Sequence, residues 1–301
     1  MDLRRAAVGL LAAVIGVGGL AACDPAPAPR VPGRGAYVGR PTPEAVEDFS
    51  DWAGPPATTH IHSFIPQGRE GTRGFDEING WIDDVLPLVA QSSRRLVLSV
   101  PLVPAGSTLA SVAEGDGHRR LTKLARALRA SGRGRAVIRL GWESNGTWFR
   151  WYADDDHQPY AYRRAFRRVV QTLRATVPRL RFEWNVICEP LRDAPRWYPG
   201  DRYVDLVGQD CYARSPDQWA RWQRGLDSVA AFAQRHGKPV AVSEWGTCVD
   251  DPGLVRSFLR WAQAHSIAYH LYWNQAPGPN ECDTRLAGLP QAAQAYRENG
   301  T

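Results

Sequence analysis

Eight short apolar segments, rich in β-branched and aromatic residues, alternate with longer segments of helical periodicity along most of this 301-residue chain. β-Branched and aromatic residues favour strands, whereas apolar residues spaced three and four apart favour amphipathic helices. The predicted strands are 36–39, 57–64, 95–103, 136–143, 181–188, 204–212, 239–246 and 268–274. The predicted helices are 43–53, 75–90, 117–130, 160–177, 216–235, 252–264 and 289–297. The link between the fifth and sixth strands is short and proline-rich, so we expect a poor helix or a single turn there.

This alternation predicts a single (β/α)8 TIM barrel over residues 36–301, because ~250 residues are typical of that fold. An open, doubly wound sheet is the competing fold. It usually carries a glycine-rich phosphate-binding turn after an early strand, and the sequence shows no such turn. In a TIM barrel the active site lies at the C-terminal ends of the strands, so residues at those ends are the candidates for function.

The first 22 residues have the layout of a bacterial signal peptide. A short basic start is followed by an uncharged apolar run, 6–20, which is shorter than the ~20 residues of a membrane-spanning helix. The run ends in Leu-Ala-Ala before Cys23, a pattern similar to a lipobox, in which the cysteine is lipidated. We therefore expect an exported lipoprotein, held at the membrane by its lipid only, with simple secretion as the alternative. Residues 23–35, rich in Pro and Ala, would form a tether.

The chain has five cysteines. With Cys23 assigned to the lipid, Cys188, Cys211, Cys248 and Cys282 form an even set in an oxidising compartment, which predicts two disulfides. Three pairings are possible. The strand order favours Cys188–Cys211 and Cys248–Cys282, because the members of each pair lie on or just after neighbouring strands. A zinc site is disfavoured because no Cys-x-x-Cys spacing is present.

The chain is basic, with a formal net charge of +6, and much of this charge lies on the solvent face of the predicted helix 160–177. An exported chain without a nucleic-acid-binding motif is not expected to bind nucleic acid. Attraction to anionic polymers of the cell envelope is compatible with the charge. We expect a monomer that uses no cofactor.

Two carboxylates lie at the ends of predicted strands. Glu143 ends the fourth strand and Glu244 lies near the end of the seventh, so they face each other across one barrel mouth. Strand alternation places Arg139 on the same face as Glu143. The next segment supplies Trp148 and Trp151, whose flat rings can stack on sugars. Two carboxylates beside aromatic surfaces are what glycoside hydrolysis requires.

Three motifs occur in order on the expected strands: Arg139-x3-Glu143-x-Asn145-Gly146-x-Trp148-Phe149-x-Trp151, Trp197-Tyr198-Pro199-Gly200-Asp201-x2-Val204-Asp205-x2-Gly208-x-Asp210-x-Tyr212, and Ser243-Glu244-Trp245-Gly246. Together they resemble glycoside hydrolase family 26, the β-mannanase family within the retaining (β/α)8 clan. The resemblance implies that Glu143 is the general acid/base and Glu244 the nucleophile. It also implies that Tyr212 hydrogen-bonds the nucleophile and that Trp273 lines the site of the cleaved sugar.

The sequence departs from the family pattern at Trp142. Mannanases of the family carry a histidine immediately before the acid/base glutamate, and that histidine helps to shape the site of the cleaved sugar. Its absence weakens the prediction of mannan as the substrate. Trp142 either lines the sugar site or packs outward against the helices, as strict strand alternation would place it.

The two carboxyl groups need opposite protonation states. Apolar surroundings from Trp142 and Trp148 would raise the pKa of Glu143 by disfavouring its charged form. Arg139 and the Tyr212 hydroxyl would instead keep the nucleophile ionised.

Several polar residues near strand ends are candidate sugar ligands. Asn145, Asn185 and Asn274 could hold sugar hydroxyls or cap loops. His62 is expected in the cleft wall or as a hydrogen-bonded core residue. The pair His60 and His62 lies on the wrong strand for a metal-dependent barrel hydrolase, and later strands lack the further ligands, so no metal is expected.

These features predict a retaining endo-β-glycosidase that hydrolyses a β-linked polysaccharide by double displacement. β-Mannan is the first candidate because of the family; β-glucan, xylan or an envelope exopolysaccharide are alternatives. A catalytically silent carbohydrate-binding barrel at the cell surface is the rival function, and Trp142 is the feature that keeps it open.

Overall fold

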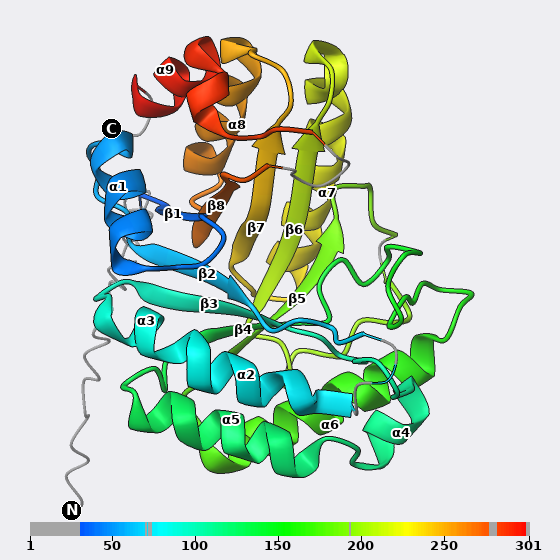
Figure 1. The fold of residues 1–301 in the computed structure, drawn as a ribbon. Coiled ribbons are helices and arrows are strands. Elements are labelled where there is room, and N and C mark those ends of the chain that lie inside the picture. The colour runs from blue at the N-terminus through cyan, green and yellow to red at the C-terminus, as the bar shows by residue number, and fades with distance from the viewer. Residues whose placement is uncertain (1–30, 70, 72–73, 193, 277–281, 299–301) are drawn as a thin grey trace, which may run out of the picture.

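The structure, a computed structural model, describes residues 31–69, 71, 74–192, 194–276 and 282–298. Eight parallel strands close into a barrel in chain order, with the eighth strand paired to the first (Figure 1). The strands are β1 (Gly33–Tyr37), β2 (His60–Phe64), β3 (Arg95–Val100), β4 (Val137–Leu140), β5 (Arg181–Ile187), β6 (Leu206–Ala213), β7 (Val240–Thr247) and β8 (Tyr269–Trp273). The predicted (β/α)8 barrel is confirmed.

Helices cover the outside of this barrel (Figure 1). They are α1 (Pro43–Ala53), α2 (Glu77–Asp84), α3 (Leu86–Gln91), α4 (Leu109–Glu114), α5 (His118–Ala130), α6 (Pro159–Thr176), α7 (Trp219–Arg235), α8 (Pro252–Ala264) and α9 (Pro290–Glu298). The predicted helix 75–90 is divided into α2 and α3, because Pro87 has no amide hydrogen to continue one helix. Helix α4 was not predicted. Among the described residues no helix lies between β5 and β6, as the proline-rich link suggested.

The barrel begins earlier than the sequence predicted. Strand β1 runs from Gly33 to Tyr37, so the last residues assigned to the tether belong to the barrel instead. The predicted signal peptide, Cys23 and the rest of the tether lie outside the described residues. No helix in the described part of the chain has both the length and the apolar character needed to cross a membrane.

The barrel interior has an apolar end and a polar end. Six buried side chains pack together towards the starts of the strands, namely Val97, Val137, Leu206, Ala241, Tyr269 and Leu271. Further along the strands, the inward positions carry Arg139, Asn185, Asp210 and Glu244, each no more than 4% exposed. A larger apolar core buries the outward strand side chains against the helices. Because one end of the barrel is filled by apolar side chains, the polar chemistry is confined to the other.

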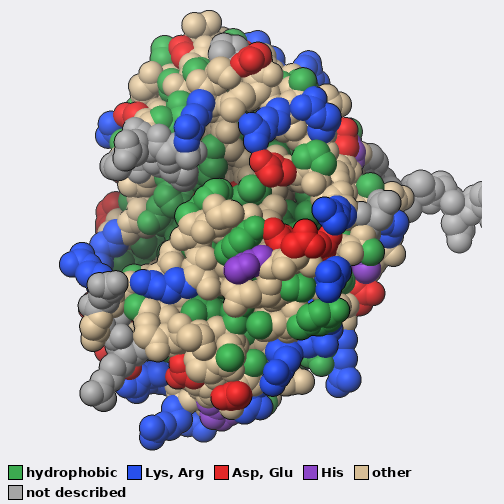
Figure 2. Space-filling model, turned by 90° about the vertical axis from the view of Figure 1, so that its right-hand side faces the viewer, with side chains coloured by type: hydrophobic (Ala, Val, Ile, Leu, Met, Phe, Trp, Pro, Cys, Tyr) green, Lys and Arg blue, Asp and Glu red, His purple; other side chains and the backbone are tan. Residues whose placement is uncertain are grey.

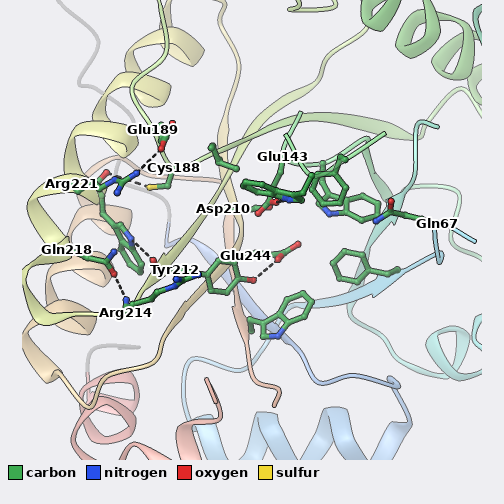
Figure 3. A pocket seen from close by; sticks show the side chains of 17 residues that line it. Gln67, Glu143, Cys188, Glu189, Asp210, Tyr212, Arg214, Gln218, Arg221 and Glu244 are labelled. Atoms are coloured by element: carbon green, nitrogen blue, oxygen red, sulfur yellow. Dashed lines mark hydrogen bonds and ion pairs between the residues drawn. The ribbon is translucent and has the colours of Figure 1, made fainter. Parts of the chain in front are cut away.

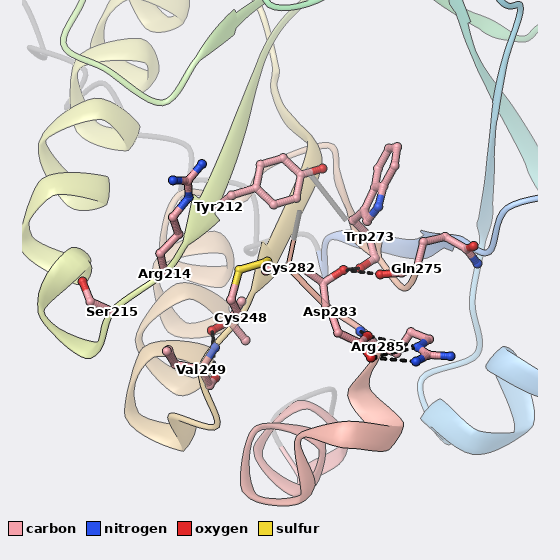
Figure 4. The surroundings of a disulfide bond; sticks show 12 residues. Tyr212, Arg214, Ser215, Cys248, Val249, Trp273, Gln275, Cys282, Asp283 and Arg285 are labelled. Atoms are coloured by element: carbon pink, nitrogen blue, oxygen red, sulfur yellow. Dashed lines mark hydrogen bonds and ion pairs between the residues drawn. A yellow bond between two sulfur atoms is a disulfide. The ribbon is translucent and has the colours of Figure 1, made fainter. Parts of the chain in front are cut away.

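Two disulfides join the ends of neighbouring strands. Cys188 pairs with Cys211, with Cα atoms 5.0 Å apart, and ties the end of β5 to β6. Cys248, just after β7, pairs with Cys282, with Cα atoms 5.7 Å apart (Figure 4). Both are the pairings that the strand order favoured.

Candidate active site

A cavity of about 710 Å³ lies at the C-terminal ends of the strands. The surface of the protein is hollowed on one side, and the walls of the hollow are largely hydrophobic (Figure 2). The cavity is lined by Phe64, Gln67, Trp142, Glu143, Trp148, Phe149, Ile187, Cys188, Glu189, Asp210, Tyr212, Arg214, Gln218, Arg221, Trp222, Glu244 and Trp273. In Figure 3, Gln67 lies at one end, Arg214 and Arg221 lie at the other, and Glu143 and Glu244 lie between them.

Glu143 reaches the cavity because β4 ends early. The predicted strand ran to residue 143, but β4 stops at Leu140 and is followed by Gly141, whose φ is +55°. A Cβ atom at position 141 would lie 2.7 Å from the Cβ atom of Leu102, so only glycine fits there. Glu143 itself has a φ of +47°, a strained value for a residue with a side chain. This sharp turn breaks the alternation and brings Trp142 and Glu143 together to the cavity wall.

Glu244 reaches the cavity through an irregularity in β7. Asp210 pairs with Glu244 and its neighbour Gln209 pairs with Val242, so the register skips Ser243. The Ser243 hydroxyl points into the barrel and donates to the carboxylate oxygens of Glu183 at 2.6 and 2.7 Å. Such a bulge re-aims the residues beside it, and here two consecutive side chains face the interior.

Arg139 is the charged centre of the site. Its fully buried guanidinium forms ion pairs with Asp210 and with Glu244 Oε1. It also donates to the Ser99 hydroxyl at 3.0 Å and to Asn185 Oδ1 at 3.2 Å. A buried cation is stable only when charges and hydrogen bonds compensate its lost hydration. The arginine therefore fixes the position of the nucleophile candidate while satisfying its own charge.

Three carboxylates converge around this arginine. One oxygen each from Glu143, Asp210 and Glu244 lies within 4.8 Å of the other two. Among the described residues this is the group of potential ligands close enough to share a cation. Because Arg139 already pairs with two of the three, we assign no metal here.

The surroundings of Glu143 favour its protonated form. Burial raises its pKa to about 7, and the negative charge of Glu244 acts in the same direction. Arg139 and the Trp148 indole, which donates to Glu143 Oε2 at 3.0 Å, oppose this rise. A carboxyl group with such a pKa can give and recover a proton near neutral pH.

Glu244 has polar partners on both carboxylate oxygens. Arg139 contacts Oε1, and the Tyr212 hydroxyl donates to Oε2 at 2.5 Å. Both contacts hold the carboxylate in one orientation. Trp273 also lines the cavity, with its ring centre 6.3 Å from that of Tyr212. The residues that the sequence assigned to this half of the site thus lie together.

Two of the tryptophans after β4 line the cavity wall, and a third packs behind it. Trp142 lines the cavity and packs edge-on against Phe64 and Phe149, so it does not pack outward against the helices. Trp148 is 64% exposed at the cavity rim. Trp151, predicted to bind substrate, is fully buried, does not line the cavity, and donates to the Trp142 carbonyl at 2.8 Å. Its side chain supports the wall from behind.

The other predicted sugar ligands are occupied by protein contacts and do not line the cavity. His62 is fully buried, and its Nε2 lies 2.9 Å from the Ser99 hydroxyl. Asn145 Oδ1 accepts from the Ile187 amide at 2.8 Å, and Asn274 Oδ1 accepts from the Leu286 amide at 3.0 Å. These side chains hold loops and strands in place.

Asn185 has a different role, because it joins both halves of the site. Its Oδ1 accepts from the Glu143 amide at 2.7 Å, and its Nδ2 donates to Asp210 at 3.0 Å and to Glu183 at 3.1 Å. Asn185 therefore orients the backbone of Glu143 and the side chains of Asp210 and Glu183.

The sequence reasoning missed several site residues. Asp210 stands within a quoted motif but was given no role; its place two residues before Tyr212, on the same strand face, was the available signal. Burial raises its pKa well above the usual range. Arg214, Arg221 and Trp222 on the far cavity wall gave no signal, because they lie on a link and a helix start whose direction the sequence does not reveal.

The sequence matches the model of glycosyl hydrolase family 26 over residues 119–282, more than half of the chain. A mannan endo-1,4-beta-mannosidase of Bifidobacterium adolescentis is 31% identical in an alignment of 119 residues that covers 36% of this chain. The matched part spans about 12% of the length of that relative.

Solved structures share the fold. GH26C from Muricauda sp. MAR_2010_75 superposes with a TM-score of 0.63 and 15% identity, over 90% of this chain and 85% of that one. A GH26 beta-mannanase from Bacteroides ovatus superposes with a TM-score of 0.57 and 17% identity, over 80% of this chain and 77% of that one. A modular endo-beta-1,4-mannanase from Cellulomonas fimi superposes with a TM-score of 0.58 and 23% identity, over 79% of this chain and 63% of that one. At these identities the likeness concerns the fold alone.

Proposed function

Because the chain belongs to glycosyl hydrolase family 26, we propose that it is a retaining endo-β-glycosidase that cleaves a β-linked polysaccharide between Glu143 and Glu244. The observation that carries the proposal is that carboxylate oxygens of these two residues lie within 4.8 Å of each other. Retaining enzymes hold their two carboxyl groups ~5–5.5 Å apart, whereas inverting enzymes hold them ~6.5–9.5 Å apart to admit a water. The short separation supports retention.

In the first step, an oxygen of Glu244 bonds to the anomeric carbon while the bond from that carbon to the bridging oxygen breaks. Glu143 gives its proton to the bridging oxygen, so the departing sugar leaves as a neutral alcohol. Arg139 and Tyr212 hold the two oxygens of the attacking carboxylate, which orients it before substrate binds.

In the second step, water releases the covalently bound sugar. Glu143, now ionised, takes a proton from the water as the water oxygen bonds to the anomeric carbon and the bond to Glu244 breaks. Both carboxyl groups return to their starting states. A pKa of about 7 suits Glu143 for both steps, because it must lose and regain one proton near neutral pH.

The shape of the cavity supports cleavage within a chain. The carboxylates lie between its two ends, so sugars can extend in both directions from the cleaved bond (Figure 3). Trp148 and Trp273 line the cavity and are aromatic surfaces on which sugars can stack. β-Mannan is the first candidate because of the family and the mannosidase relative. β-Glucan, xylan and envelope exopolysaccharides are the alternatives, because Trp142 replaces the family's histidine.

We also propose that the enzyme is exported and anchored through a lipid on Cys23, and that it acts as a monomer. Two disulfides in the folded domain fit an oxidising compartment outside the cytoplasm.

The test is a polysaccharide panel of mannan, mixed-linkage β-glucan and xylan, read out by new reducing ends. We expect the purified protein to cleave one of these, and the Glu244→Ala variant to be inactive. Activity that survives Glu244→Ala would contradict the mechanism. Tight oligosaccharide binding without turnover of any glycan would instead indicate a silent carbohydrate-binding barrel.

A further inference from the structure

One wall of the cavity carries a positive charge that the proposed mechanism does not use. Arg214 follows β6 directly, is exposed, and lines the cavity. Within the described part of the chain its guanidinium forms no hydrogen bond or ion pair, whereas its backbone amide donates to Gln218 Oε1. An arginine fork left free on a cavity wall is available to a ligand.

The position of Arg214 relates it to the reacting centre. Tyr212, two residues earlier on β6, contacts Glu244, and both Tyr212 and Arg214 line the cavity. Two strand residues span ~6.7 Å, a step comparable with one pyranose ring. Figures 3 and 4 show the Arg214 side chain beside the Tyr212 ring. The guanidinium therefore lies on the other side of the Tyr212 ring from Glu244, towards the end of the cavity, where a sugar beyond the cleaved bond would lie.

The backbone that carries Arg214 is held on both sides. The Gln218 side chain accepts from the amides of Arg214 and Ser215, the latter at 3.3 Å. Before it, the Tyr212 carbonyl accepts from the Trp222 indole at 3.3 Å. The base of the side chain is thus fixed in advance, which lowers the entropy lost when its end binds a ligand.

The neighbouring charges leave this wall positive. Arg221 also lines the cavity, but it pairs with Glu189 at 2.8 Å. With side chains 62% and 46% exposed, that pair is weak and open to exchange. The whole chain carries +6, which attracts anionic polymers over a longer range.

We propose that Arg214 binds an anionic substituent, a carboxylate or a phosphate ester, on a sugar adjoining the cleaved bond. The natural substrate is then an acidic polysaccharide. This deepens the proposed function and rests on it. A guanidinium donates two parallel hydrogen bonds to either anion, a geometry that a neutral hydroxyl cannot match.

The experiment compares one β-linked oligosaccharide of mannose or glucose in three forms: neutral, oxidised to the carboxylate at C6, and phosphorylated at C6. For each form kcat/KM is measured with the wild type, Arg214→Gln and Arg164→Gln. Arg164 lies on α6, is exposed and does not line the cavity, so it controls for the change in net charge. Binding to the Glu143→Gln variant, with and without Arg214→Gln, is measured by calorimetry.

We expect one of the acidic forms to be the best wild-type substrate, and Arg214→Gln to lower its kcat/KM about tenfold relative to the neutral form. The carboxylate and phosphate arms show which anion is preferred. Arg164→Gln should leave the ratio unchanged. Equal losses on acidic and neutral forms, or no loss, would overturn the proposal. If no form is cleaved, the proposed hydrolysis is wrong. Calorimetry then still tests Arg214, because tighter binding of an acidic form should be lost with Arg214→Gln.

Discussion

Glu143 and Glu244 are chemically the same side chain, but they lie in contrasting surroundings. Glu143 lies beside Trp142 and Trp148 on a cavity wall that is mostly apolar, and burial raises its pKa to about 7. Glu244 lies 4% exposed between a guanidinium and a phenol, which contact both of its oxygens. The neighbours of each carboxyl group thus support the proposed division into acid and nucleophile.

The largest expected effect is the loss of the nucleophile. Glu244→Ala removes the atom that forms the covalent intermediate, so kcat on the polysaccharide should fall by about 10⁴-fold or more. Glu47→Ala is the control, because this glutamate is exposed on α1 and does not line the cavity. A loss of activity in Glu47→Ala that matched Glu244→Ala would remove the distinction between them.

The stability of the folded protein should depend on Arg139, which pairs with the buried carboxylates of the site. Arg139→Met leaves buried carboxylates without their cation, so the free energy of unfolding should fall by about 3–5 kcal/mol. Arg285→Met is the control, because it breaks a pair whose side chains are 56% and 47% exposed, and should cost at most about 1 kcal/mol. Urea denaturation of both variants measures the difference. Equal losses would mean that the buried network contributes no more than a surface pair.

Tyr212 should matter less than the nucleophile but more than a tyrosine that lies outside the cavity. Tyr212→Phe removes one hydrogen bond to a charged carboxylate, worth about 1.5–3 kcal/mol, so kcat should fall about 10- to 100-fold. The fold should persist, because the ring remains. Tyr198→Phe removes a similar bond to Asp201, a residue outside the cavity lining, and should leave kcat unchanged. Steady-state kinetics of both variants measure the difference in kcat.

The smallest effect concerns the pH profile. The acid role needs protonated Glu143, so kcat/KM should decline as pH rises through about 7. Trp148 donates to the ionised carboxylate and thereby lowers its pKa. Trp148→Phe should therefore move the alkaline limb to higher pH. An alkaline limb that moved to lower pH would show that the indole does not stabilise the charged form.

The fold was open to prediction because its signals are local. Eight apolar runs, their helices and four cysteines in an oxidising compartment gave the barrel and both disulfides. Strand ends were less certain, because β4 stops at a glycine with positive φ and β1 begins at Gly33 within the predicted tether.

The site was predictable where strand position decides it. Glu143, Glu244 and Tyr212 come to the cavity from the strand ends where the sequence set them. The placement of Trp142 could not be derived, because the turn at Gly141 overrides alternation. Trp151 was predicted to bind substrate but lies behind the cavity wall, whereas for the asparagines the sequence left both roles open. Whether such a side chain faces the cavity or holds a neighbouring segment depends on tertiary contacts.

The most direct test of the central claim is the configuration of the first product. Cleavage of the preferred oligosaccharide is followed by proton NMR during the first minutes, before the new reducing end equilibrates. Two cooperating carboxylates within 4.8 Å predict that the β-anomer is formed first. An α-anomer at the outset would mean a single displacement by water, and would contradict the assignment of Glu244 as nucleophile.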